Sequence, residues 1–292
     1  MSKRSLRVVR PFFQSIRCLV ALVGVSSLCA CALPTTLIST STTPAALTAF
    51  VEQLTRQPLP QVILLGEQHD VPEHQQLHRS AALALSSGHQ LAALVIEMAE
   101  QGQTTQSLHP LADEAAVRTA LAWDTDAWPW AAYGPAVMVA VRAGVPVLGA
   151  NLPRAQWRDA MQDTTLDARL PATALRAQQH AIRVGHCNLL PDSQVAPMTR
   201  IQIARDLAIA STLKSATQPN KTVLLLAGHG HVNRELGVPQ HLPPGFTSRA
   251  ILLQATSVSD MTNNPSFDVT WSLGTAPQAD YCAAFSASLT PP

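Results

Sequence analysis

Short apolar runs that end on a glycine or a polar residue recur along the chain, and they constrain its fold more than any other feature. Four of them have strand length and are continuously apolar, as in strands buried on both faces of a sheet. They are Gln61–Gly66, Leu91–Met98, Val145–Ala150 and Thr222–Ala227. Two later runs, Arg249–Ala255 and Phe267–Leu273, have a similar character and predict two more strands.

Segments with apolar residues at helical spacing lie between these runs. They are Pro72–Ser87, Asp113–Ala122, Pro135–Ala143, Pro153–Met161, Ala172–Val184 and Pro197–Ala216. Strands that alternate with helices are typical of βαβ units and a parallel sheet. The chain shows no internal repeat and no break in composition after Thr48. We therefore predict the α/β class, with residues 49–292 as a single domain that has a mostly parallel central sheet flanked by helices.

The first thirty residues differ from the rest of the chain in charge. They contain five Lys and Arg residues and no Asp or Glu, and their apolar run from Cys18 to Ala30 is too short to span a bilayer. This layout predicts a secretory signal peptide over residues 1–30. The string Leu28-Cys29-Ala30-Cys31 resembles a bacterial lipobox and predicts acylation of the Cys31 thiol. The alternative is an ordinary cleavage site that leaves Cys31 as a free thiol.

The lipobox interpretation has consequences for the segment that follows. Residues 31–48 are rich in Thr, Ser and Pro and are expected to form a flexible tether from the lipid anchor. Because Ala32 rather than Asp follows the cysteine, we expect an envelope lipoprotein of the outer membrane rather than the inner membrane.

Net charge and composition exclude some classes of function. The whole chain has a formal charge of +1, and without its basic first thirty residues it has 15 basic and 19 acidic residues, a charge of −4. Only 4% of the residues are aromatic. A mildly acidic chain with few aromatics lacks both the basic surface and the stacking platform that nucleic-acid binding needs. The apolar fraction of 47% also excludes an intrinsically disordered chain.

Polar residues follow each of the four predicted central strands. The strand ends carry Glu67 and His69, then Glu97, then Asn151 and Arg154, and last His229 and His231. In an open α/β sheet, ligands bind beyond the carboxyl ends of the strands. We therefore expect the binding site of the protein at this edge.

Two imidazoles and one carboxylate at this edge permit two kinds of chemistry. His69, His231 and Glu97 match the set of two histidines and one carboxylate that holds a divalent metal ion, and the same residues suit general acid–base work. We interpret His229 as an ordinary loop residue. His74 and His78 lie four residues apart on a predicted helix, and we interpret that pair as solvated surface.

Five strings of the sequence resemble the ChaN-like haem-binding lipoproteins of the Tiki superfamily. They are Leu64–Asp70, Val95–Met98, Gly149–Arg154, Leu226–Asn233, and the pair His186–Pro191 with Ala204–Asp206. The resemblance covers about residues 59–242. It implies a haem-binding protein that acts in haem or iron uptake at the cell envelope. It also implies a pocket that a second copy of the chain can complete as a homodimer.

The resemblance assigns roles to particular residues. It implies haem ligation by a tyrosine, and Tyr133 lies in the matching aromatic segment. Arg154 is expected to pair with a haem propionate, and Glu67, His69 and His231 to line the site. The alternatives are an aromatic Tyr133 that packs on Trp128 or Trp130 and an Arg154 in a surface salt bridge. The larger superfamily also resembles erythromycin esterases, which leaves a second hypothesis, a metal-dependent or acid–base hydrolase using His69, Glu97 and His231.

Cys187 and Cys282 remain beside the predicted lipidated cysteine. An exported protein meets an oxidising compartment, in which two such thiols can form a disulfide. The sequence leaves that pairing and two unconnected buried cysteines equally open.

Overall fold

The computed structural model describes residues 43–255, 264–274, 281–283 and 286. The described residues belong to one compact unit. The predicted signal peptide, Cys31 and most of the predicted tether lie outside the described residues, so they stay predictions.

The helices and strands alternate along the chain as the sequence pattern indicates. The first half contains α1 (Pro44–Leu54), β1 (Val62–Glu67), α2 (Pro72–Ser87), β2 (Leu91–Glu100), α3 (Glu114–Ala120), α4 (Trp130–Arg142) and β3 (Val147–Asn151). The second half contains η1 (Arg154–Gln156), α5 (Trp157–Gln162), η2 (Thr164–Arg169), α6 (Ala172–Gly185), α7 (Asp192–Ala216), β4 (Thr222–Gly228), α8 (His229–Val232), η3 (Val238–His241), β5 (Ser248–Gln254) and β6 (Val269–Ser272).

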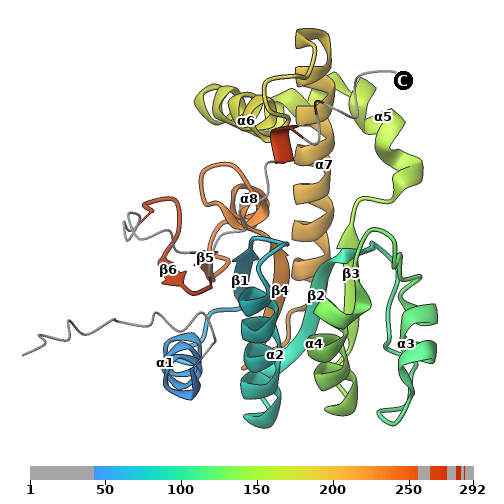
Figure 1. Cartoon of the computed structure of the whole chain (residues 1–292), viewed down its shortest axis with the longest axis vertical. Coiled ribbons are helices and arrows are strands. Elements are labelled where there is room, and N and C mark those ends of the chain that lie inside the picture. The colour runs from blue at the N-terminus through green and yellow to red at the C-terminus, as the bar shows by residue number, and fades with distance from the viewer. Residues whose placement is uncertain (1–42, 256–263, 275–280, 284–285, 287–292) are drawn as a thin grey trace, which may run out of the picture. The chain divides into compact units, whose positions relative to one another are not determined.

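The six strands form one sheet in the order β3-β2-β4-β1-β5-β6. Every neighbouring pair of these strands is parallel. Figure 1 shows the strands β1, β4, β2 and β3 running side by side with their carboxyl ends toward the α8 and α7 side of the molecule. The predicted α/β class, with a parallel sheet flanked by helices, is confirmed.

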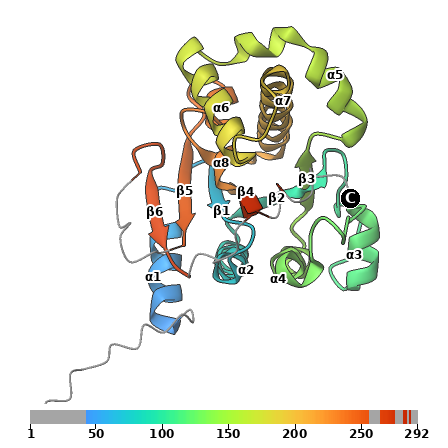
Figure 2. The same ribbon diagram turned by 45° about the horizontal axis from the view of Figure 1, so that its top comes forward.

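Both faces of the sheet are covered by helices, as Figure 2 shows. Alternate residues of β1 divide between two apolar layers. Ile63 and Leu65 pack in the layer under α1, α2 and α4. Val62 and Leu64 pack in the layer under α7. A strand that is buried on both sides needs apolar side chains at every position, which explains the continuous apolar runs in the sequence.

Helix α1 occupies part of the segment that we expected to be a flexible tether. It begins at Pro44, whereas the tether was predicted to reach residue 48. The Thr43 side chain accepts a hydrogen bond from the Ala46 N–H at 3.2 Å and caps the helix, and a proline suits its first position. Phe50 and Leu54 of this helix are fully buried, so packing against the sheet stabilises it.

Two helices begin earlier than the sequence predicts. Helix α4 was expected from Pro135 and helix α7 from Pro197, but each begins five residues before its proline. The added turns bury side chains, among them Tyr133 in α4 and Val195 in α7. Because a proline near a helix start disrupts few hydrogen bonds, burial of these turns outweighs its cost.

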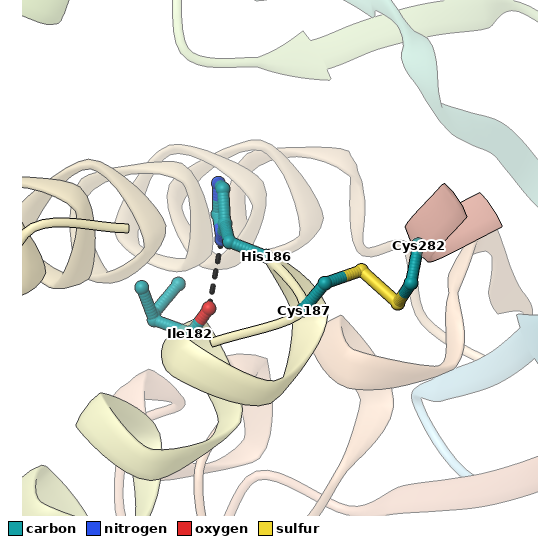
Figure 3. The surroundings of a disulfide bond; sticks show 4 residues. All are labelled: Ile182, His186, Cys187 and Cys282. Carbon is teal, nitrogen blue, oxygen red and sulfur yellow. Dashed lines mark hydrogen bonds between the residues drawn. A yellow bond between two sulfur atoms is a disulfide. The ribbon is translucent and has the colours of Figure 1, made fainter. Parts of the chain in front are cut away.

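Of the two alternatives that the sequence leaves open for Cys187 and Cys282, the structure has the disulfide. It joins the turn after α6 to the C-terminal segment 281–283, with a Cα–Cα distance of 5.4 Å (Figure 3). The same turn is held by His186, whose Nδ1 donates to the Ile182 carbonyl oxygen at 2.7 Å. Among the described residues, no helix has both the length and the apolar character required to cross a bilayer.

Candidate functional site

The carboxyl ends of β1, β2 and β4 meet because these three strands are neighbours in the sheet. Two glycines allow the close approach. A Cβ at Gly66 would lie 2.2 Å from Val232 Cγ2, and a Cβ at Gly228 would lie 2.8 Å from His69 Nε2. Neither position has room for a side chain. The chain therefore brings the loop after β1 and helix α8 together over the ends of the strands.

Glu67 is the last residue of β1 and is fully buried. Its Oε1 accepts hydrogen bonds from His69 Nδ1 and from the Tyr133 hydroxyl, both at 2.8 Å. Burial raises the pKa of Glu67. The nearby His78 and the hydrogen bonds from His69 and Tyr133 together lower the pKa by more than burial raises it, so it lies below its ordinary value. Glu67 is therefore a carboxylate that fixes the orientation of both side chains.

His74 and His78 do not lie in solvent, so that part of the sequence interpretation is wrong. Both are fully buried on the inner face of α2. His78 Nε2 lies 3.6 Å from Glu67 Oε2. His74 Nδ1 accepts from the Gln68 N–H at 3.1 Å and its Nε2 donates to the Leu273 carbonyl at 3.2 Å, and burial lowers its pKa to about 4. These histidines therefore contact the end of β1 and the loop that follows it.

Glu97 and His231 form a second buried group with Asp206 of α7. His231 Nδ1 donates to Asp206 Oδ1 at 2.6 Å, and its Nε2 lies 3.3 Å from Glu97 Oε1. Glu97 Oε2 accepts from the Gly228 N–H at 2.7 Å. Burial lowers the pKa of His231, but the two carboxylates raise it to about 10. His231 is therefore a buried imidazolium held between two acids.

The structure brings the predicted residues His69, Glu97 and His231 together without forming the predicted metal set. In the described part of the chain, no three His, Cys, Asp or Glu side chains make up a group that could hold a metal ion. The two nitrogens of His231 face carboxylates, so neither is free to bind a cation. His69 Nε2 lies 3.9 Å from Glu97 Oε2, and its side chain is 40% exposed. His69 is the more accessible imidazole of the two.

Tyr133 lies inside the site and not at its rim. It is 3% exposed and packs edge-on against Trp128, with 5.8 Å between the ring centroids. Trp128 also packs edge-on against His69 at 4.9 Å. Burial and the neighbouring Glu67 carboxylate raise the pKa of Tyr133 far above its ordinary value. The phenol is therefore a hydrogen-bond donor to Glu67, and its oxygen does not face solvent.

Residues 53–242 match the family described as haem-binding uptake, Tiki superfamily, ChaN. The chain belongs to this family. No curated protein matches the ChaN-family chain by sequence.

Solved structures resemble the ChaN-family chain to different degrees. One described as "Cofacial heme binding to ChaN of Campylobacter jejuni" is 23% identical, with a TM-score of 0.56 over 74% of this chain and 87% of that one. The type III effector HopBA1 is 15% identical, with a TM-score of 0.43 over 79% of this chain and 94% of that one. A mutant of the erythromycin esterase EreC, in its open conformation, is 16% identical, with a TM-score of 0.42 over 72% of each chain. The first of these supports the fold of the ChaN-family chain.

A cleft of about 320 Å³ opens beside the buried groups of the ChaN-family chain. Glu97 and Trp128 line it next to His69, and Arg154, Trp157 and Arg205 line it farther away. Its volume is at the lower end of the range for small-molecule sites. Arg154 is 67% exposed and its NH2 lies 3.6 Å from Asp124 Oδ2, so it forms the surface salt bridge that was the alternative interpretation.

Sequence reasoning missed Asp206 and Arg205, which the sequence interpretation did not include among the candidate site residues. A usable signal existed for Asp206, because its spacing from Ile203, Ile209 and Ala210 places it on the apolar face of α7. A charged residue on the buried face of a helix requires a partner, and His231 is that partner. His229, interpreted as a loop residue, is exposed, and its Nδ1 donates to the Glu67 carbonyl at 3.2 Å.

Proposed function

We propose that the chain binds haem and that the His69 imidazole would hold its iron. The observation that carries the proposal is the state of His69. Its Nδ1 is held by Glu67, its ring is half exposed beside the cleft, and its Nε2 makes no hydrogen bond within the described part of the chain. A carboxylate that holds the second nitrogen of a histidine is the usual support of a metal-binding imidazole. Membership of a haem-binding uptake family agrees with it.

Tyr133 takes a different part in this proposal from the one that the resemblance implies. Tyrosine is a known axial ligand of haem, but the hydroxyl of Tyr133 is buried and donates to Glu67. We assign it the positioning of Glu67 and, through Glu67, of His69. Bound haem would supply an iron that accepts one further donor, while this chain supplies the imidazole and the walls of the cleft.

The cleft suggests how the rest of the porphyrin is covered. A cleft of about 320 Å³ encloses only part of so large a ligand. We propose that a second copy of the chain covers the remainder, in a homodimer around haem. The solved structure from Campylobacter jejuni is described as binding haem cofacially, which supports this arrangement.

The cellular role follows from the first thirty residues and the family. We propose that the protein is a lipoprotein of the cell envelope, anchored through Cys31 to the outer membrane, and that it acts in haem or iron uptake without binding nucleic acid. Both nitrogens of His231 face carboxylates, which argues against a metal-dependent hydrolase that uses this histidine.

A hemin titration of the purified chain followed by the Soret band tests the proposal. We expect saturable binding that His69→Ala weakens by roughly 10-fold or more, and that shifts the Soret maximum. Tyr133→Phe should keep the wild-type Soret maximum. If Tyr133 were the ligand of the iron, this substitution would shift the maximum. His180→Ala, at an exposed position of α6, is the matched control. Absence of saturable binding contradicts the proposed function, and an unchanged spectrum in His69→Ala contradicts the assigned ligand.

A further inference from the structure

The far wall of the cleft contains two guanidinium groups on one indole ring. Arg154 belongs to η1, Trp157 begins α5 and Arg205 lies in α7. The Arg205 guanidinium lies 5.0 Å from the centroid of the Trp157 ring, and that of Arg154 lies 5.7 Å from it. The Trp157 Nε1 donates to the Leu152 carbonyl at 3.2 Å, which fixes the ring. Helices α5 and α7 lie side by side at this point in Figures 1 and 2.

Arg205 is the cation of this wall that lacks a partner. Among the described residues it forms no hydrogen bond and no salt bridge, and its Nε atom is buried without an acceptor. Arg154 differs, because it is mostly exposed and faces Asp124. A charged group that is withdrawn from water without a partner is costly, and such groups are normally paired. The guanidinium of Arg205 is therefore placed for an anion that is not part of the described chain.

The acids that line the cleft do not supply that anion, since each already has another partner. Glu97 faces His231 and accepts from the Gly228 N–H. Glu100 accepts from the Arg154 main-chain N–H at 3.0 Å. Asp124 accepts from the Ala127 N–H at 3.1 Å and faces the Arg154 side chain. None of these acids forms a hydrogen bond or a salt bridge with the Arg205 guanidinium.

The surroundings of Arg205 favour the binding of a carboxylate to its guanidinium. Burial lowers the pKa of Arg205, the carboxylates of Glu97 and Asp206 raise it, and the net shift is downward. A guanidinium that remains charged but poorly solvated gains more than an exposed one from a bidentate carboxylate. Asn151 Oδ1, in the same cleft, is also buried without a partner, but it is an acceptor and would take a donor and not a carboxylate.

We infer that Arg205, oriented by Trp157, receives a carboxylate group of the ligand in this cleft. This inference rests on the proposed function, in which the carboxylate is a haem propionate. The sequence analysis expected Arg154 to pair with the propionate, whereas this inference assigns that pairing to Arg205, which also contacts the Trp157 ring. Arg154, exposed and paired with Asp124, closes the outer rim. The propionate edge of the porphyrin would then face α5 and α7, and His69 would hold the iron at the centre of the ring.

A comparison of hemin with hemin dimethyl ester, which lacks both free carboxylates, tests this inference on the full chain. We expect the wild type to bind hemin at least about 10-fold more tightly than the ester, a difference in binding free energy of about 1.4 kcal/mol. Arg205→Gln should remove that preference and leave the affinity for the ester unchanged. Arg205→Lys keeps the charge without the planar fork and should retain part of the preference.

Arg158→Gln is the matched control, because it removes one exposed positive charge from the same helix as Trp157. It should leave the preference for hemin intact, and Arg154→Gln should reduce it less than Arg205→Gln does. Equal binding of hemin and ester by the wild type, or a preference that survives in Arg205→Gln, would overturn the inference alone. If neither porphyrin binds saturably, the proposed function fails and this assignment fails with it.

A melting curve of the ligand-free variants separates a ligand-binding role of Arg205 from a structural one. Removal of an unpartnered, partly buried charge should leave the melting temperature of Arg205→Gln equal to that of the wild type or higher. A clear decrease in melting temperature, together with unchanged hemin preference, would show that Arg205 stabilises the fold and does not bind the ligand.

Discussion

His69 and His231 follow neighbouring strands of one sheet edge, yet their surroundings differ. The His69 side chain is 40% exposed, holds one carboxylate through Nδ1 and leaves Nε2 without a hydrogen bond among the described residues. The His231 side chain is 6% exposed and lies between Asp206 and Glu97. Position at a strand end therefore does not by itself make a histidine a ligand. Of the two imidazoles, one is available to a ligand, and the other neutralises buried acids.

The largest difference between the two histidines should appear in stability. His231→Ala leaves Glu97 and Asp206 as buried carboxylates without their cation, and we expect it to lower the free energy of unfolding by about 3–5 kcal/mol. His69→Ala removes a half-exposed ring, and we expect a loss of about 1 kcal/mol or less. Urea unfolding of both variants without ligand measures the difference. Equal losses would show that the two sites do not differ in this way.

The pH dependence of stability above pH 7 should report mainly the titration of His231. Its pKa is about 10 in the folded chain, against an ordinary value of 6.5. A raised pKa gives stability that is fully present below about pH 6.5 and is lost as the pH rises toward 10. The slope for one proton is at most about 1.4 kcal/mol per pH unit. Asp206, whose pKa burial raises to about 6, titrates mainly below this window.

Urea unfolding between pH 7 and 9.5 measures this slope. The difference in unfolding free energy between the wild type and His231→Gln should shrink steadily as the pH rises. The same difference for His69→Gln should change much less, because His69 is partly exposed to solvent. A constant difference for His231→Gln would mean that its imidazole is neutral in the folded chain.

A similarly small effect on stability should come from a substitution of Gly228, which lies against His69. A Cβ at this position would lie 2.8 Å from His69 Nε2, at the free end of that side chain. Gly228→Ala should therefore displace the His69 ring, lower hemin affinity, and cost about 1 kcal/mol of stability or less. Gly185→Ala is the control, since a Cβ there would meet no atom within 4 Å. Unchanged hemin affinity in Gly228→Ala would place the ligand away from His69.

The sheet could be predicted from the sequence because strands buried on both faces are written as continuous apolar runs. The strand ends Glu67, His69, Glu97 and His231 followed from the rule that parallel strands gather their carboxyl ends at one edge. Which of these residues is accessible to a ligand and which pairs with buried acids could not be predicted. It depends on Asp206 and Tyr133, which reach the edge from α7 and α4, and only the packing of helices on the sheet brings them there.

The error in the interpretation of His74 and His78 has a physical cause. Imidazoles are often solvated, which favours surface positions, but the spacing of these two residues from Leu77 and Ala81 puts them on the apolar face of α2. Burial, which decides which charges need partners, depends on tertiary contacts that one-dimensional spacing does not contain.

The position of β1 in the sheet has a consequence for how the chain must assemble. Its two neighbours are β4 and β5, which come from residues 222–254, although β1 itself ends at Glu67. Until the last quarter of the chain has emerged, this fully buried strand has neither edge paired. Contacts so distant in sequence slow folding and expose unpaired strand edges to aggregation. The pairing of β1 with β4 and β5 therefore forms late. A chaperone that shields residues 62–67 during synthesis would protect the chain from aggregation before that pairing.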